Sequence, residues 1–316
     1  MISIGLDVGG TKVLGVALDS TDPGTLLAEE RVATPDGGAG LVDALLRVAA
    51  RLEDVVRDRG PVGAMGVGVP GLVDRHGTLH VGAHLRHIAD LELSRAMTDG
   101  AGVPVLVDND ANCHALAERR AGAAKGAVDA LVVTLGTGIG AGVITQGRVL
   151  HGANGFAGEP GHMIVDPNGP PCPCGQRGCW ERFASGSGLA RLARDAAAGG
   201  RLDAAVELAG GHEELVQGEH VTTAARAGDA QAQAVLDDFA WWIGLGLANL
   251  TNILDPATIV IGGGLVEAAD LLLPRVEAHF ADLVMAGEER RLPPIVAAHL
   301  GERAGAIGAA LLPTEG

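Results

Sequence analysis

The 316-residue sequence lacks tyrosine and contains seven aromatic residues, three Trp and four Phe. Its core must therefore be built mainly from aliphatic residues, and hydrophobic residues make up 47% of the chain. Lysine is nearly absent, and the 39 acidic residues outnumber the 23 basic ones to give a net charge of −16. Binding to nucleic acid or to an anionic membrane needs clustered Lys and Arg, so the composition argues against both.

Long apolar runs are missing as well. No stretch approaches 18 uninterrupted apolar residues, and no basic segment precedes an apolar one at the start of the sequence. We therefore expect a cytoplasmic protein. Cysteine is scarce, but three of the four cysteines lie within eight positions, which favours a metal site over disulfides.

Glycine is the residue in excess, with 49 positions but no three-residue period, which excludes collagen. Residues 2–19 and 130–146 share one layout: a strand, a glycine turn and a second strand. The turns are Gly9–Lys12 and Gly136–Gly140. This repeat predicts two similar α/β halves, with no low-complexity linker between them, that face one cleft. The segment 199–218 is the expected flexible surface.

Hydrophobic periodicity predicts the remaining elements. The expected strands are residues 2–8, 13–19, 26–33, 63–69, 103–107, 130–135, 141–146, 257–261 and 295–300. The expected helices are residues 39–59, 91–99, 187–198, 222–228, 230–253 and 303–312, with further helices after Asp110 and after Gly264.

Each glycine turn lets the backbone approach a ligand closely. In the first turn, N–H groups and the Thr11 hydroxyl are available to phosphate oxygens, and Asp7 at the strand end is placed to hold Mg²⁺, directly or through water. Either turn alone has an ordinary hairpin as its alternative. Two turns at matching places favour a polyphosphate site. A third cluster, Gly262–Gly264, suits the adenosine or ribose of a nucleotide, although strand–glycine–helix turns are also common structural features.

The segment Asp108-Asn109-Asp110 follows an aliphatic strand and precedes a helix. A carboxylate at that position can accept a proton from a substrate hydroxyl, and the neighbouring amide can hydrogen bond to a polyol. Capping of the helix N-terminus is the competing interpretation, because Asp and Asn are common caps.

The segment from Glu159 to Glu181 contains the most specific pattern. His162, Cys172, Cys174 and Cys179 form a complete Cys₃His set for a structural Zn²⁺, in a loop stiffened by prolines. Folding of the loop on zinc would bring Glu159 and Glu181 near His162, whose second ring nitrogen would remain free to meet a ligand.

Three other features have mainly structural interpretations. His76, His80, His84 and His87 are spaced like ligands but are expected to form a solvated loop, with a metal site as the alternative. Cys113 is expected to be a small buried residue. Trp241 and Trp242 are expected to pack in a core or a subunit interface.

Five motifs, in order and over nearly the whole chain, resemble the ROK (repressor, open reading frame, kinase) family of sugar kinases, in particular glucokinases of the actinobacterial type. They are Asp7-x-Gly-Gly-Thr-Lys12, Asn109-Asp110-Ala-Asn112, Leu135-Gly-Thr-Gly-Ile-Gly-Ala-Gly142, Glu159-x-Gly-His162 and the run CPCGQRGCWE that ends at Glu181. In one segment the chain departs from many relatives: it has Ala83-His84-Leu85 where they carry Pro-Asn-Leu, which leaves the preferred hexose open.

The resemblance implies a two-domain, actin-like and ribonuclease H-like ATPase fold with a cleft between domains. One domain would be residues 1–109 plus the C-terminal helix 303–316, and the other residues 110–302 with the zinc loop 162–179. It implies an ATP-dependent hexose kinase, with glucose first and N-acetylglucosamine, N-acetylmannosamine, mannose, allose or fructose as alternatives. A homodimer or homotetramer is expected, and the use of polyphosphate in place of ATP stays open.

The resemblance also implies residue roles. Asp110 would be the general base. Asn109, Asp110, Glu159, His162 and Glu181 would bind the sugar, and His162 would also ligate zinc. The residues expected at ATP and Mg²⁺ are Asp7, Gly9, Gly10, Thr11, Lys12, Gly136, Thr137, Gly138, Gly262, Gly263 and Gly264. A sugar-responsive repressor of the same family is a further alternative, but the first turn begins at residue 7 and leaves no room for a preceding DNA-binding motif. A non-catalytic sugar sensor would carry a damaged base or turn, and both motifs are intact.

Overall fold

The computed structural model describes residues 2–19, 21–82, 85 and 88–315. The chain forms two compact units: the first comprises Met1–Val132, Ala141–Gly158 and Ala298–Gly316, and the second Val133–Gly140 and Glu159–Ala297. The division expected at residues 109 and 110 falls inside the first unit. Helix α3 (Asp110–Ala121) belongs there because it packs against α10 (Ala304–Leu311).

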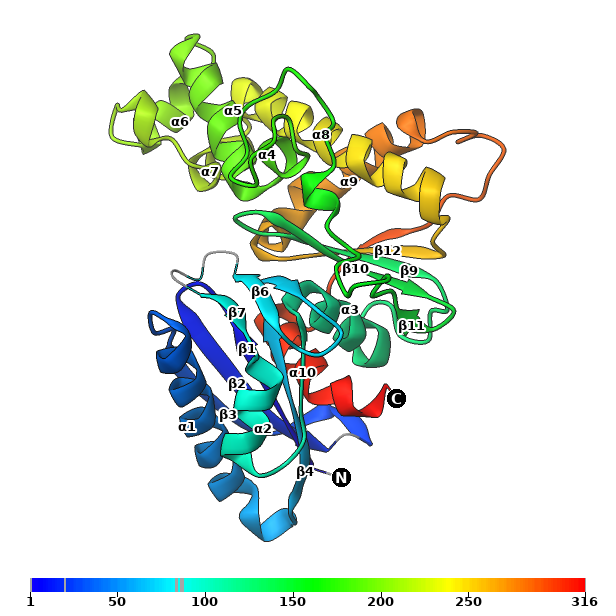
Figure 1. The fold of residues 1–316 in the computed structure, drawn as a ribbon. Helices are drawn as coiled ribbons and strands as arrows, with labels where there is room; N and C mark the ends of the chain where they lie inside the picture. Colours follow the sequence, from blue (N-terminus) through cyan, green and yellow to red (C-terminus); the bar gives the residue numbers. More distant parts are fainter. Residues whose placement is uncertain (1, 20, 83–84, 86–87, 316) are drawn as a thin grey trace. The chain divides into compact units, whose positions relative to one another are not determined.

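A five-stranded sheet forms the first unit, in the order β3-β2-β1-β4-β8. The strands are β1 (Ile2–Val8), β2 (Lys12–Asp19), β3 (Asp22–Ala33), β4 (Val62–Val69) and β8 (Val105–Asn109). β1 pairs antiparallel with β2 and parallel with β4, and β4 pairs parallel with β8. The strands of this sheet are therefore joined by both hairpin and crossover connections, as Figure 1 shows.

The two faces of this sheet have separate cores. Alternate residues of β2 divide between them: Val13 and Ala17 belong to the core that includes α1 (Gly38–Val56), whereas Leu14 and Leu18 belong to the core that includes α10. This division follows from the two-residue period of a strand. Helix α2 (Leu93–Ala101) packs against α1.

Two glycines let α10 lie directly on the sheet. A Cβ atom at Gly5 would lie 1.9 Å from the carbonyl oxygen of Ala306, and one at Gly66 would lie 1.9 Å from that of Ala309. Real Cβ atoms do not approach backbone oxygens so closely. The small residues of β1 and β4 are thus required by the packing of the C-terminal helix.

The second sheet has the order β11-β10-β9-β12-β13. Its strands are β9 (Ala130–Leu135), β10 (Ile139–Thr145), β11 (Arg148–Val149), β12 (Thr258–Gly262) and β13 (Ile295–Ala297). The helices of the second unit are α4 (Glu181–Ala184), α5 (Gly186–Ala198), α6 (Asp203–Leu208), α7 (Gly218–Arg226), α8 (Ala230–Leu254) and α9 (Ala269–Leu283). Helix α8 is central, since α4, α5, α7 and α9 all pack against it.

Several elements differ from the expectation. Residues 199–218, where no helix was expected, contain α6. The strand expected over 295–300 ends at Ala297, because the backbone N–H groups of His299 and Leu300 donate to the buried carboxylate of Glu118. A small sheet of β5 (Gly71–Val73), β6 (Leu79–Gly82) and β7 (Ala89–Leu91) was not expected at all.

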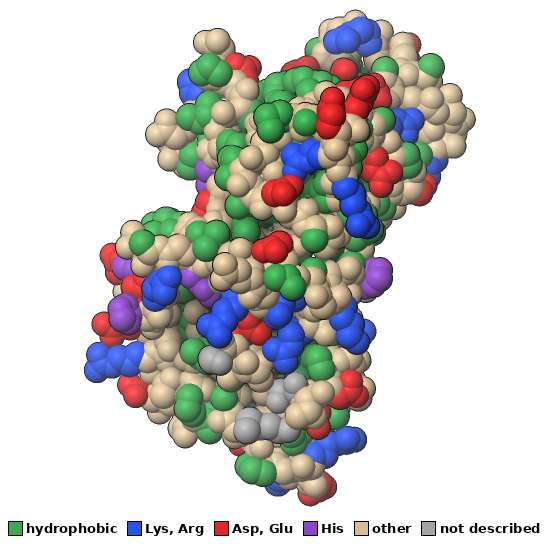
Figure 2. Space-filling model, turned by 90° about the vertical axis from the view of Figure 1, so that its right-hand side faces the viewer, with side chains coloured by type: hydrophobic (Ala, Val, Ile, Leu, Met, Phe, Trp, Pro, Cys, Tyr) green, Lys and Arg blue, Asp and Glu red, His purple; other side chains and the backbone are tan. Residues whose placement is uncertain are grey.

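Within the described part of the chain, no helix is both long and apolar enough to cross a membrane. On the face drawn in Figure 2, Lys and Arg side chains lie interspersed with Asp and Glu side chains. This distribution agrees with the absence of basic runs from the sequence.

Candidate active site

The first glycine turn joins β1 to β2 and is closed by its own backbone. The N–H of Gly9 donates to the carbonyl oxygen of Lys12 at 2.8 Å. Thr34, which follows β3, holds the turn from outside: its N–H donates to the carbonyl of Thr11 at 3.0 Å and its hydroxyl to the carbonyl of Gly9 at 2.7 Å. The carbonyl groups of Gly9 and Thr11 are therefore tied to the residue that follows β3.

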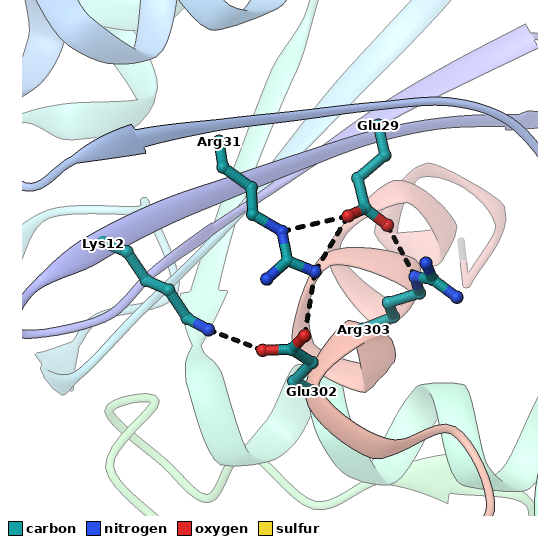
Figure 3. A network of polar contacts seen from close by, with 5 residues as sticks. All are labelled: Lys12, Glu29, Arg31, Glu302 and Arg303. Atoms are coloured by element: carbon teal, nitrogen blue, oxygen red, sulfur yellow. Dashed lines mark hydrogen bonds and ion pairs between the residues drawn. The ribbon is translucent and has the colours of Figure 1, made fainter.

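Lys12 belongs to an ion network shown in Figure 3. Its Nζ atom lies 2.5 Å from Glu302, and Arg31 bridges Glu302 and Glu29 at 2.8 Å each. Arg303 completes the network by donating to Glu29. Hydrogen bonds from Lys12 and Arg31 lower the pKa of Glu302 to about 2. The network connects the first turn to the residues that precede α10.

Asp7 lies at the end of β1, against α10. A Cβ atom at Gly305 would lie 2.5 Å from the carboxyl carbon of Asp7. Burial raises the pKa of Asp7 to about 6; His114 lowers the pKa, Asp110 raises it and Lys12 lowers it. The carboxyl groups of Asp7 and Asp110 thus interact within the first unit.

Asp110 is the first residue of α3, and Asn109 is its N-cap. The Asn109 side chain accepts from the N–H of Ala111 at 2.8 Å and from that of Asn112 at 3.3 Å, and its amide donates to the carbonyl of Gly71 at 3.1 Å. The capping interpretation is therefore confirmed for Asn109. Asp110 also accepts from the N–H of Ala111, at 3.0 Å.

No local sequence pattern indicates the partners of Asp108, which immediately precedes this pair. Asp108 is buried, and one of its carboxylate oxygens lies 2.7 Å from Nε2 of His151. The other oxygen accepts from Asn112 at 2.9 Å and from the N–H of Asn109 at 2.7 Å. Asp108 therefore fixes the strand end that carries Asn109 and Asp110.

The second glycine turn joins β9 to β10 and repeats the construction of the first. The N–H of Gly136 donates to the carbonyl of Gly138 at 3.0 Å. The carbonyl of Gly136 accepts from the N–H of Gly186 at 2.8 Å, and the carbonyl of Thr137 accepts from the hydroxyl of Ser187. Residues from the start of α5 therefore hold this turn, as Thr34 holds the first.

The four expected zinc ligands come together in the second unit. The ligand atoms of His162, Cys172, Cys174 and Cys179 all lie within 4.8 Å of one another. The sulfurs of Cys174 and Cys179 are 3.6 Å apart, and Nδ1 of His162 lies 3.7 Å from the sulfur of Cys172. A tetrahedral zinc with thiolate ligands needs edges of about 3.8 Å, so the donor set fits Zn²⁺.

Glu181 connects this cluster to the second turn. Its Oε1 atom lies 3.2 Å from the sulfur of Cys172 and 3.9 Å from Nδ1 of His162. A Cβ atom at Gly138 would lie 2.7 Å from Oε2 of Glu181. Glu159 precedes the short helix that ends at His162, and its carbonyl accepts from the N–H of His162 at 3.2 Å.

The third glycine cluster ends β12 and is required in part by packing. Gly263 has a positive φ of 84°, and a Cβ atom there would lie 2.5 Å from the carbonyl oxygen of Leu135. A 3₁₀ helix, Gly264–Ala268, follows before α9 begins. The α-helix expected directly after Gly264 is thus delayed by one turn, while Gly264 itself borders open space.

The two units divide the expected site residues between them. Asp7, Gly9, Gly10, Thr11, Lys12, Asn109 and Asp110 belong to the first unit; Gly136, Thr137, Gly138, Glu159, His162, Glu181, the three cysteines of the cluster and Gly262–Gly264 belong to the second.

The histidine segment contains no metal cluster among the residues that the structure describes. His80 lies between two carboxylates, with Asp74 at 3.0 Å and Asp90 at 2.9 Å. His76 is exposed. His84 and His87, like Ala83 of the departing segment, fall outside the described residues.

Cys113, Trp241 and Trp242 were the remaining residues with expected structural roles. Cys113 is buried, as expected. Trp242 stacks on Phe183 with ring centroids 4.0 Å apart, so it packs in the second unit as expected. Trp241 meets Trp242 edge-on but remains 36% exposed.

Comparison with known proteins agrees with the motifs. The chain is 34% identical over 317 residues to a glucokinase of Streptomyces coelicolor, covering 99% of this chain and 98% of the relative. It is 37% identical to a glucokinase of Halalkalibacterium halodurans, covering 96% and 92%. The crystal structure of a ROK family glucokinase from Streptomyces griseus, in complex with glucose and AMPPNP, superposes with a TM-score of 0.86 at 36% identity and full coverage of both chains.

These similarities confirm the actin-like ATPase fold that the motifs implied. The ROK family model matches residues 3–315. The chain therefore belongs to the ROK family.

Proposed function

We propose that the protein is an ATP-dependent hexose kinase that transfers the γ-phosphate of ATP to a sugar hydroxyl, with glucose as the first expected acceptor. The observation that carries the proposal is the position of Asp110. It begins α3 at the end of a parallel strand, and its charge interacts with Asp7 at the first glycine turn. A proton acceptor and a phosphate-binding turn thus adjoin within one unit.

In this proposal Asp110 accepts the proton of the attacking hydroxyl. The Asn109 side chain already caps α3 and donates to a backbone carbonyl. A sugar hydroxyl would therefore bind to the hydrogen-bonding positions of the amide that these contacts leave unused. Glu159, His162 and Glu181 bind other hydroxyls of the sugar. Because Nδ1 of His162 faces the thiols, Nε2 is the nitrogen that meets the sugar.

The two glycine turns would receive the phosphates through backbone N–H groups, and Gly262–Gly264 would lie near the adenosine. A bound Mg²⁺ supplies charge neutralisation on the phosphates in this class of reaction. Asp7 fits this ion as an oxygen donor, directly or through water. Lys12 adds a positive charge at the same turn.

The Cys₃His cluster would hold a structural Zn²⁺. Burial raises the pKa of the Cys172 thiol, and a bound cation favours its thiolate form. The cluster orients His162 and lies against Glu181, so its role is to shape the sugar site. A cytoplasmic location and a homodimer or homotetramer complete the proposal.

A coupled assay with ATP and a panel of hexoses tests the proposal. Glucose is expected to give the highest kcat/KM, with N-acetylglucosamine, N-acetylmannosamine, mannose, allose and fructose as the other acceptors to be measured. A parallel series with polyphosphate identifies the phosphoryl donor. Sugar binding without phosphorylation of any hexose would instead indicate a regulator or sensor, and the kinase proposal would be wrong.

A further inference from the structure

The two glycine turns are held in the same way, by residues that none of the five motifs contains. In each turn the N–H of the first glycine closes the turn onto a carbonyl two or three residues later: Gly9 onto Lys12, and Gly136 onto Gly138. In each turn two further carbonyl groups accept one N–H and one hydroxyl from a neighbouring segment.

The neighbouring segments are unrelated in sequence and in secondary structure. Thr34 follows strand β3 and supplies both donors to the first turn, its N–H to Thr11 and its hydroxyl to Gly9. The start of α5 supplies the donors to the second turn, the N–H of Gly186 to Gly136 and the hydroxyl of Ser187 to Thr137. The same hydrogen-bond arrangement therefore arises twice from different elements.

This arrangement matters for an anionic ligand because a peptide group presents a negative oxygen on one side and a positive N–H on the other. A carbonyl turned toward a phosphate would repel it. A donor bonded to that carbonyl fixes the orientation of its peptide plane, so the N–H of the following residue keeps one direction. Glycine is the residue least able to fix that orientation by itself.

We propose that the hydroxyls of Thr34 and Ser187 are positioning groups for the phosphates of ATP, each holding the carbonyl side of one glycine turn so that its N–H side faces the nucleotide. The inference rests on the proposed kinase function. Neither residue touches the phosphates in this account; each acts through the turn that it holds.

The Ser187 hydroxyl has a second contact that supports this role. It lies 3.1 Å from the hydroxyl of Ser185, which donates to the carbonyl of Glu181 at 2.6 Å. Ser185 also caps α5 by accepting from the N–H of Gly188 at 3.2 Å. Ser187 at the start of α5 is thus linked through Ser185 to Glu181, the first residue of α4, whereas the loss of Ser185 would also remove a helix cap.

The test compares Thr34→Val and Ser187→Ala, which remove the hydroxyls, with Thr34→Ser and Ser187→Thr, which keep them. Loss of one neutral hydrogen bond changes an equilibrium by roughly 2- to 10-fold. We expect KM for ATP and the Kd of Mg-AMPPNP to rise by about that factor in the first pair, with KM for glucose within about twofold of wild type. The second pair should restore both values.

Ser94→Ala is the matched control, because the Ser94 hydroxyl also donates to a backbone carbonyl, that of Val105 at 2.6 Å, at the start of β8. Thermal unfolding of every variant separates general destabilisation from misplacement of a turn. The inference would be overturned if Thr34→Val and Ser187→Ala had the same KM for ATP and Kd of Mg-AMPPNP as wild type or Ser94→Ala. An equal rise in KM for ATP and in KM for glucose would also overturn it. Absence of hexose phosphorylation by the wild-type protein would be the failure of the proposed function, and the Mg-AMPPNP measurement then still decides the inference.

Discussion

His151 and Asp108 form a hydrogen-bonded pair, with 2.7 Å between Nε2 and Oδ2, and Asp108 immediately precedes Asn109 at the end of β8. The hydrogen bond to Asp108 raises the pKa of His151, against the opposing effects of burial and of Arg75. Because the pKa is higher in the folded state, the protonated imidazole stabilises folding below its unfolded pKa. That contribution is lost as the pH rises through the folded pKa.

His151→Gln should therefore lose more stability in acid than in base. We expect the variant to be less stable than wild type by about 1 kcal/mol or less near pH 6, because the His151 side chain is 39% exposed. This difference in the free energy of unfolding should shrink near pH 8.5. Urea unfolding at both pH values measures it, with His76→Gln as the control for an exposed histidine. A difference independent of pH would contradict the pairing.

Asp110→Asn tests the proposed role of Asp110 as general base. The substitution keeps the size of the side chain and one acceptor oxygen but removes its ability to accept a proton, so glucose binding should change little. We expect kcat to fall roughly 10²- to 10⁴-fold. Calorimetry measures glucose binding, and the coupled assay measures kcat. An unaltered turnover rate would rule out Asp110 as the base.

The Cys₃His cluster predicts about one zinc per chain in the purified protein. Cys172→Ser should lose the metal and lower the thermal midpoint, since the loop from His162 to Cys179 surrounds the cluster. Cys113→Ala is the matched control, because Cys113 is free and is not a member of the cluster. Elemental analysis measures the metal. Equal zinc contents in wild type and Cys172→Ser would show that these side chains are not the ligands.

The parts of the site that could be predicted from sequence are those encoded by neighbouring residues. The glycine turns, the cap at Asn109 and the Cys₃His spacing are each local patterns. The partners Thr34 and Ser187 could not be found in this way, because Ser187 lies 50 residues from the carbonyl that it holds. The only local signal was the Ser185-Gly186-Ser187-Gly188 run, which is typical of a helix start.

In the fold, too, the features set by residues far apart in the sequence could not be predicted. Strand and helix periodicity predicted β1, β2 and α8 closely, since long amphipathic or buried segments have a clear period. The strand expected to continue to residue 300 stops at Ala297 because of Glu118, a residue 181 positions away from His299. The sheet of β5, β6 and β7 consists of strands of three or four residues, too short to show a period.

Gly138→Ala probes the contact between the second turn and Glu181. The added Cβ would lie 2.7 Å from Oε2 of Glu181, the mobile end of a side chain, so the carboxylate should move while the fold stays intact. If Glu181 binds the sugar as proposed, a displaced carboxylate would lose that hydrogen bond, and we expect KM for glucose to rise roughly 10-fold or more. Gly40→Ala is the control for the substitution itself, because its Cβ would make ordinary contact with Pro35 at 3.5 Å.

A double-mutant cycle separates this effect from a direct disturbance of the phosphate turn. If Gly138→Ala acts by moving Glu181, its effect on KM for glucose should largely disappear in a Glu181→Gln background, because the group that it displaces has already lost its charge. Additive effects of the two substitutions would instead mean that the alanine acts on the turn. In that case Gly138→Ala should raise KM for ATP. The cycle thus measures how far the Glu181 carboxylate and the second glycine turn depend on each other within the second unit.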